Sequence, residues 1–164
     1  MSVNEEQLIK RDRMRFTKNT LSSGLALLAI LFNVLYFVSI YKSDVGSFYY
    51  NIIIGASILY NLIFMLVVFL SSEGVRGYKA SFAYALLVVG VLQIVRIFIL
   101  PMRAHTATVT VSQQETVVMQ TAQFLRVVVY LCASAACCLI AGIVGIQKSR
   151  VLAAHMATLE QKAA

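Results

Sequence analysis

A few polar side chains interrupt the long apolar stretches of this sequence, and their chemistry decides what the chain can do. In a hydrocarbon environment each of them costs free energy unless it finds a partner. An amide can hydrogen-bond across a helix contact, and a guanidinium can bind an anion. These intramembrane polar candidates are Asn33, Asn51, Asn61, Gln93 and Arg96.

Arg96 is the charged member of this set. We favour the interpretation that its side chain extends toward the outer lipid headgroups, since a long basic side chain near a helix end reaches the interface at little cost. Two alternatives stay open, an anion contact and an interhelical pairing with Asn51. Gln93 and Gly90 lie on the same helical face as Arg96, at successive spacings of three.

The residue types that membrane enzymes and carriers need are missing from the apolar runs. None has an Asp, Glu, His or Lys in its middle, and His105 and His155 fall outside them. Proton coupling, haem ligation and metal-dependent hydrolysis depend on such residues. All three cysteines lie in one run without C-x-x-C spacing, at 132, 137 and 138. We expect no enzyme, catalytic residue, cofactor or metal site.

The polar candidates lie in or next to four uncharged apolar runs, which cover residues 21–41, 45–72, 80–95 and 127–147. About 18 apolar residues suffice for a helix to cross the hydrocarbon layer, which is roughly 30 Å thick. A hydrophobic content of 60% in 164 residues exceeds what a soluble core would absorb. We predict an all-α integral membrane protein, a four-transmembrane-helix bundle in residues 21–146. Its spans are expected at about 21–41, 47–70, 78–100 and 124–146.

The basic residues predict the orientation of this bundle. Of fourteen Lys and Arg, five lie in residues 1–20, two in 71–80 and three after 146. Those regions share one side if there are four crossings, so both termini should be cytoplasmic, with the plasma membrane as location. We expect no nucleic-acid partner, because the basic residues flank apolar runs. We expect residues 1–20 to form a cytoplasmic basic amphipathic segment that contacts anionic headgroups through Lys10, Arg11, Arg13, Arg15 and Lys18.

The longest connection, 102–123, has two patterns. Residues 106–111 alternate in a strand-like way, whereas Ser112 followed by Glu115 resembles a capping box. If the box is used, the fourth helix begins near Gln113. Apolar residues at helical spacing also continue into 147–164, which we expect to be a cytoplasmic helical tail. The fourth helix should therefore extend beyond the bilayer.

Small residues recur at helical spacing within the runs and predict close helix contacts. The helix-packing candidates are Ala26, Ala29, Gly55, Gly90, Ser134, Cys138, Ala141 and Gly145. In the second run the expected face joins Asn51, Gly55 and Ile58. The simplest role for these stripes is to hold the bundle together.

With no reactive constellation, we expect a non-catalytic membrane protein. Our first hypothesis is an accessory, scaffolding or regulatory subunit of a larger membrane complex such as a transporter. The alternative is a self-assembling pore or small transporter lined by Asn and Gln side chains. The expected partners are the bilayer and either other membrane subunits or further copies of the chain.

Overall fold

The computed structural model describes residues 17–40, 51–99, 101–106, 108–111, 114–117 and 119–163. In this part of the chain, four helices are long and apolar enough to cross a membrane, the number that the sequence predicts. They are α2 (Thr20–Ile40), α4 (Asn51–Arg76), α5 (Ala80–Ile99) and α7 (Thr121–Ala163). A short helix, α6 (Pro101–Thr106), and a hairpin of β1 (Thr108–Val111) and β2 (Gln114–Val117) connect α5 to α7.

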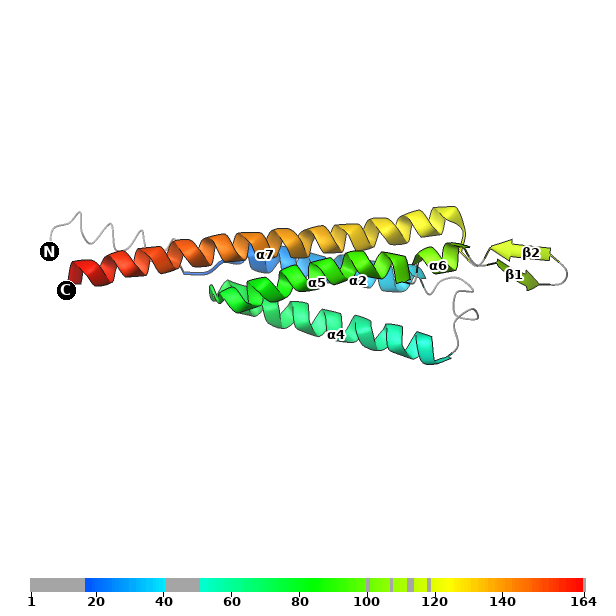
Figure 1. The fold of residues 1–164 in the computed structure, drawn as a ribbon, viewed down its shortest axis with the longest axis horizontal. Helices are drawn as coiled ribbons and strands as arrows, with labels where there is room; N and C mark the ends of the chain where they lie inside the picture. Colours follow the sequence, from blue (N-terminus) through cyan, green and yellow to red (C-terminus); the bar gives the residue numbers. More distant parts are fainter. Residues whose placement is uncertain are drawn as a thin grey trace.

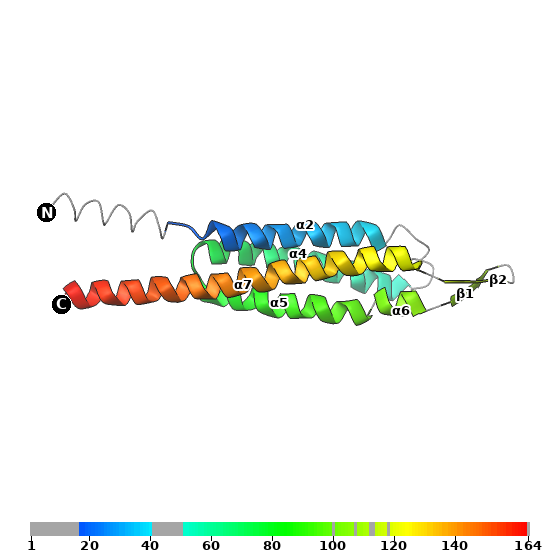
Figure 2. The same ribbon diagram turned by 90° about the horizontal axis from the view of Figure 1, so that it is seen from above.

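The four long helices form a ring in the order α2, α4, α5, α7. Helix α7 packs along α2 and α5, and α4 packs against the same two helices from the opposite side. Figures 1 and 2 show that α2 begins and α7 ends at the same end of the bundle, and that α7 continues past the other helices there. In Figure 1, α4 is close to α5 at the turn that joins them and diverges from it toward the opposite end.

The connection from α5 to α7 differs from the sequence expectation. Helix α5 ends at Ile99, and Pro101 opens α6, where a missing N–H does no harm. The prediction that the fourth helix begins near Gln113 is wrong. Glu115 pairs with Thr110 in an antiparallel hairpin, and α7 begins at Thr121. Alternating Thr and Val favour extended backbone here. Pairing between β1 and β2 gives the backbone N–H and C=O groups of these residues the hydrogen bonds that a helix would otherwise supply.

The turn between α4 and α5 has a Schellman arrangement. The N–H of Lys79 bonds to the carbonyl of Gly74 at 3.1 Å, and that of Tyr78 to the carbonyl of Val75 at 3.1 Å. Tyr78 has φ 59°, the left-handed conformation that glycine usually supplies at this position. The hydroxyl of Ser149 in α7 donates to the Tyr78 carbonyl at 2.8 Å, which fixes the turn against the bundle.

Ser149→Ala should lower the free energy of unfolding by about 1 kcal/mol, because the hydrogen bond that joins the Tyr78 carbonyl to α7 is lost. The measurement is reversible unfolding in detergent. Thr158→Ala is the matched control, since the Thr158 hydroxyl donates to the His155 carbonyl within its own helix, at an exposed position. Equal effects of the two variants would contradict a role for Ser149 in holding the turn.

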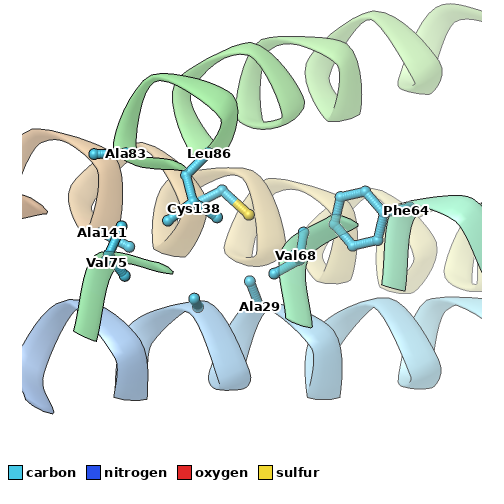
Figure 3. Packing of buried hydrophobic residues seen from close by; sticks show 9 residues of the cluster. Ala29, Phe64, Val68, Val75, Ala83, Leu86, Cys138 and Ala141 are labelled. Carbon is cyan, nitrogen blue, oxygen red and sulfur yellow. The ribbon is translucent and has the colours of Figure 1, made fainter. Parts of the chain in front are cut away.

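The apolar interior has two parts. One cluster, nearer the α4–α5 turn, joins small and aliphatic side chains of all four helices, together with Phe64, around Leu86 and Cys138 (Figure 3). The other lies farther along α2 and α7, around Tyr36 and Leu131, with Ala104 of α6 and Met119. Buried polar residues of the four long helices lie where the two clusters meet, and this layer is the candidate site.

Candidate functional site

A buried layer of polar side chains crosses the bundle, and every long helix contributes to it. The layer consists of Asn33 from α2, Asn61 from α4, Gln93 and Arg96 from α5, and Ser134 from α7. Their exposed fractions are 0% for Asn33, Gln93 and Ser134, 1% for Asn61 and 4% for Arg96. Sequence analysis predicted all but Ser134 as polar candidates, and named Ser134 for helix packing. The structure brings them into one network.

Arg96 is held mainly by amide oxygens. Its Nη1 donates to Oδ1 of Asn61 at 2.8 Å and to Oδ1 of Asn33 at 3.4 Å. The two asparagines also bond to each other, from Nδ2 of Asn33 to Oδ1 of Asn61 at 3.3 Å. Nδ2 of Asn61 donates to the carbonyl of Ser57 on its own helix at 3.1 Å, which orients the amide toward Arg96. Helices α2, α4 and α5 are joined by these bonds.

Gln93 extends the network to α7. Its Nε2 donates to Oδ1 of Asn33 at 3.0 Å and to Oγ of Ser134 at 3.3 Å. The Ser134 hydroxyl in turn donates to the backbone carbonyl of Ala29 in α2 at 2.9 Å. A side chain bonded across helices in this way fixes their relative rotation as well as their distance.

The positive charge of Arg96 lies between two aromatic rings. The guanidinium carbon is 4.4 Å from the ring centroid of Tyr36 in α2 and 4.7 Å from that of Tyr60 in α4. Cation–π contacts of this kind are stronger away from water. No carboxylate pairs with Arg96 in the described part of the chain, where the ion pair is that of Arg76 with Glu73. Nη2 of Arg96 and Oε1 of Gln93 have no hydrogen-bond partner there.

The expectation that Arg96 extends toward the headgroups is therefore wrong. Its face of α5 also carries Ala83, Leu86 and Gly90, all buried. This face packs into the bundle, and tyrosine rings and amide oxygens stabilise the charge where it lies. The alternative pairing with Asn51 cannot be placed, because the side chain of Asn51 lies outside the described residues.

A cavity of about 260 Å³ adjoins Arg96 where α4 and α5 diverge. Its wall is mostly aliphatic, with Tyr60 and Arg96 among the few polar side chains. From α4 come Ala56, Ser57 and Tyr60, and from α5 come Leu92, Val95, Arg96 and Ile99. Sequence analysis did not identify Ser57, Tyr36 or Tyr60 as part of a site. The spacing of four between Ser57 and Asn61 and the spacing of three between Asn33 and Tyr36 pointed to shared helix faces.

The predicted packing residues are buried in three of the four long helices but not in α4. Buried members occur in α2, α5 and α7, at Ala26, Ala29, Gly90, Ser134, Cys138, Ala141 and Gly145. Gly55 is exposed, with nothing within 4 Å of the point where a Cβ would lie, and Ile58 is 37% exposed. The predicted α4 face is therefore wrong. Helix α4 packs through Asn61, Phe64 and Val68 instead.

Gly142, which sequence analysis missed, makes one of the closest approaches between helices. A Cβ there would lie 2.9 Å from the Ala83 carbonyl oxygen and 2.8 Å from Leu87. Its position one residue after Ala141 in a run of small residues was the available indication. Of the cysteines, Cys138 is buried and Cys132 is exposed, and the three are free thiols.

The predicted headgroup contacts fall largely outside the structure. Lys10, Arg11, Arg13 and Arg15 lie beyond the described residues, and Lys18 is exposed just before α2. In the described segments, no group of three or more His, Cys, Asp or Glu side chains is placed to hold a metal ion. The polar layer is equipped for hydrogen bonding between the four helices.

No family model, curated protein or solved structure matches this chain. Fold and site geometry are consequently the basis for any functional proposal.

Proposed function

We propose that this is a non-catalytic multi-pass protein of the plasma membrane, an accessory, scaffolding or regulatory subunit of a larger membrane complex such as a transporter. The observation that supports this proposal is the inward, interhelical bonding of the polar layer. Arg96 bonds to amides of α2 and α4, and Gln93 bonds to α2 and α7. Side chains engaged in this way hold helices together, and they leave an apolar outer surface suited to lipid or to other membrane helices.

The same burial argues against the alternative, an oligomeric pore lined by amides. A pore-lining side chain must face a water path between subunits. Asn33 and Gln93 are 0% exposed and Asn61 is 1% exposed within a single chain. Opening such a path would break the bonds that join the four helices.

The topology that goes with the proposal is N-in and C-in. Helix α2 begins and α7 ends at one end of the bundle (Figure 2), where Arg76, Lys79, Lys148 and Arg150 also lie. Forty-three residues of α7 span about 64 Å at ~1.5 Å per residue, twice the ~30 Å hydrocarbon layer. We propose that its last part extends into the cytoplasm and contacts the rest of the complex there.

The test compares the full chain with a variant that lacks residues 151–164. In native membranes solubilised with mild detergent, the full chain should migrate in an assembly well above its own 18.1 kDa. The truncated chain should keep its unfolding temperature and leave that assembly. In liposomes the purified protein should conduct no ions. A defined homo-oligomer whose ion flux disappears in Asn33→Leu/Gln93→Leu would contradict the proposal and support the pore.

A further inference from the structure

We propose that two copies of this chain associate in the membrane through α4, with Leu59 of each copy in the cavity between α4 and α5 of the other. The proposal starts from the cavity of about 260 Å³, which lies where α4 diverges from α5 (Figure 1). Its wall is almost wholly apolar. On the α5 side the wall consists mainly of Leu92, Val95 and Ile99, which are 46%, 47% and 54% exposed. The cavity is therefore open toward the lipid and suits an apolar occupant.

The exposed face of α4 beside this cavity has the spacing of a helix-pairing surface. A row of exposed residues recurs at alternating intervals of three and four, namely Ala56, Leu59, Ile63, Leu66 and Leu70. Such a period of 3.5 keeps the row in contact with a neighbouring helix over several turns. The sequence has no charge in residues 45–72, so nothing in the row repels a second copy. Exposed apolar residues also occur on α2, α5 and α7, and it is the cavity that selects α4.

The cavity and the side chain that fits it lie at the same depth, which favours a second copy as the occupant. Leu59 is 57% exposed and lies between Ala56 and Tyr60 along α4, and both of those residues line the cavity. Copies of a membrane protein insert in one orientation. A two-fold axis normal to the membrane therefore brings residues of equal depth together. A lipid chain gives no reason for a protruding side chain at this depth.

The arrangement around α4 is also self-complementary. At 3.6 residues per turn, Ala56 lies between Leu59 on one side of the helix and Tyr60 on the other. In a two-fold interface centred on Ala56 and Ile63, the Leu59 side of one copy faces the Tyr60 side of the other. The Leu59 side chain of each copy then enters the cavity of the other. A dry cavity of roughly 150 Å³ takes up benzene. The cavity of about 260 Å³ is therefore ample for a leucine side chain.

The experiment measures association of the purified full chain in phosphatidylcholine liposomes, where no other protein is present. Energy transfer between donor-labelled and acceptor-labelled copies is followed as added lipid dilutes the protein. We expect a dimer in which Leu59→Ala and Ala56→Phe each weaken association about tenfold or more, because either change removes both leucine–cavity contacts. Neither should change the unfolding temperature of the monomer in detergent, because both residues are exposed within a single chain.

A mixture of the two variants gives the sharpest comparison. A pair made of one Leu59→Ala copy and one Ala56→Phe copy keeps one complete contact, in which Leu59 of the second copy enters the open cavity of the first. The mixed pair should therefore associate more tightly than either variant with itself. Leu31→Ala, at a 52% exposed position of α2, is the matched control for Leu59→Ala and should dimerise like the unmodified protein.

A monomer at every dilution would overturn the proposal and would mean that lipid chains fill the cavity. A dimer that Leu59→Ala, Ala56→Phe and Leu31→Ala affect equally would overturn it as well, as would a mixed pair no tighter than either variant with itself. None of these results bears on the accessory-subunit proposal, because that proposal is tested by the assembly in native membranes.

Discussion

Replacing Asn61 with leucine is expected to lower the free energy of unfolding by about 3 kcal/mol or more, and most of that loss should disappear when Arg96 is leucine too. Asn61 Oδ1 is the nearest acceptor of the Arg96 guanidinium, at 2.8 Å. Removing one partner of a buried charge leaves that charge uncompensated, which costs about 3–5 kcal/mol. Without the guanidinium, the amide of Asn61 supports only neutral hydrogen bonds, each worth about 1 kcal/mol.

The measurement is a double-mutant cycle by reversible unfolding in mixed micelles, with Asn61→Leu, Arg96→Leu and the combined variant. Residues that share a network are non-additive, so the coupling energy should exceed about 1 kcal/mol. Gln147→Leu, at an exposed position of α7, is the control and should change stability little. Additive effects of the two substitutions would mean that Asn61 and Arg96 do not stabilise each other.

Gly142→Ala should destabilise the bundle by about 1–3 kcal/mol, whereas Gly24→Ala should leave it unchanged or stabilise it by up to about 1 kcal/mol. The new Cβ at position 142 would lie 2.9 Å from the Ala83 carbonyl oxygen and 2.8 Å from Leu87. Backbone on α5 cannot move away as a side-chain end can, so α5 and α7 must separate. At Gly24 nothing lies within 4 Å, and alanine has the better helix propensity.

Reversible unfolding measures the change in the free energy of unfolding for Gly142→Ala and for Gly24→Ala. The expected result is a loss of stability at Gly142 and none at Gly24. Gly55→Ala, with open space around it, serves as a second control and should behave like Gly24→Ala. Destabilisation at Gly55 equal to that at Gly142 would show that α4 packs through a face other than the one around Asn61 and Phe64.

The stripes on α2, α5 and α7 could be predicted from sequence, but that on α4 could not. Ala26, Ala29, Gln93 and Ala141 stand out because large aliphatic residues surround them, so the contact face is visible as a period. Helix α4 is apolar on all sides, and its small residue Gly55 faces outward. Its contact face was fixed by Asn61 and Phe64 meeting the other helices.

The hairpin shows a second limit of sequence analysis. The pattern at Ser112–Glu115 is compatible with a helix start, and the Thr and Val residues before it are compatible with a strand. Local patterns of this kind compete, and pairing between β1 and β2 decided the outcome for Gln114–Val117.

The sequence by itself determined the number and approximate extent of the membrane-length helices, because the length of an uncharged apolar run is a property of the chain alone. Only the tertiary structure decided where Arg96 lies. Because Arg96 is near the end of α5, its side chain could extend either to the headgroups or into the interior of the bundle. The Arg96 guanidinium lies in the interior because side chains distant in the sequence surround it there, namely Asn33, Asn61, Tyr36 and Tyr60. The rotation of each helix about its axis sets such contacts, and that rotation is fixed only when the helices pack together.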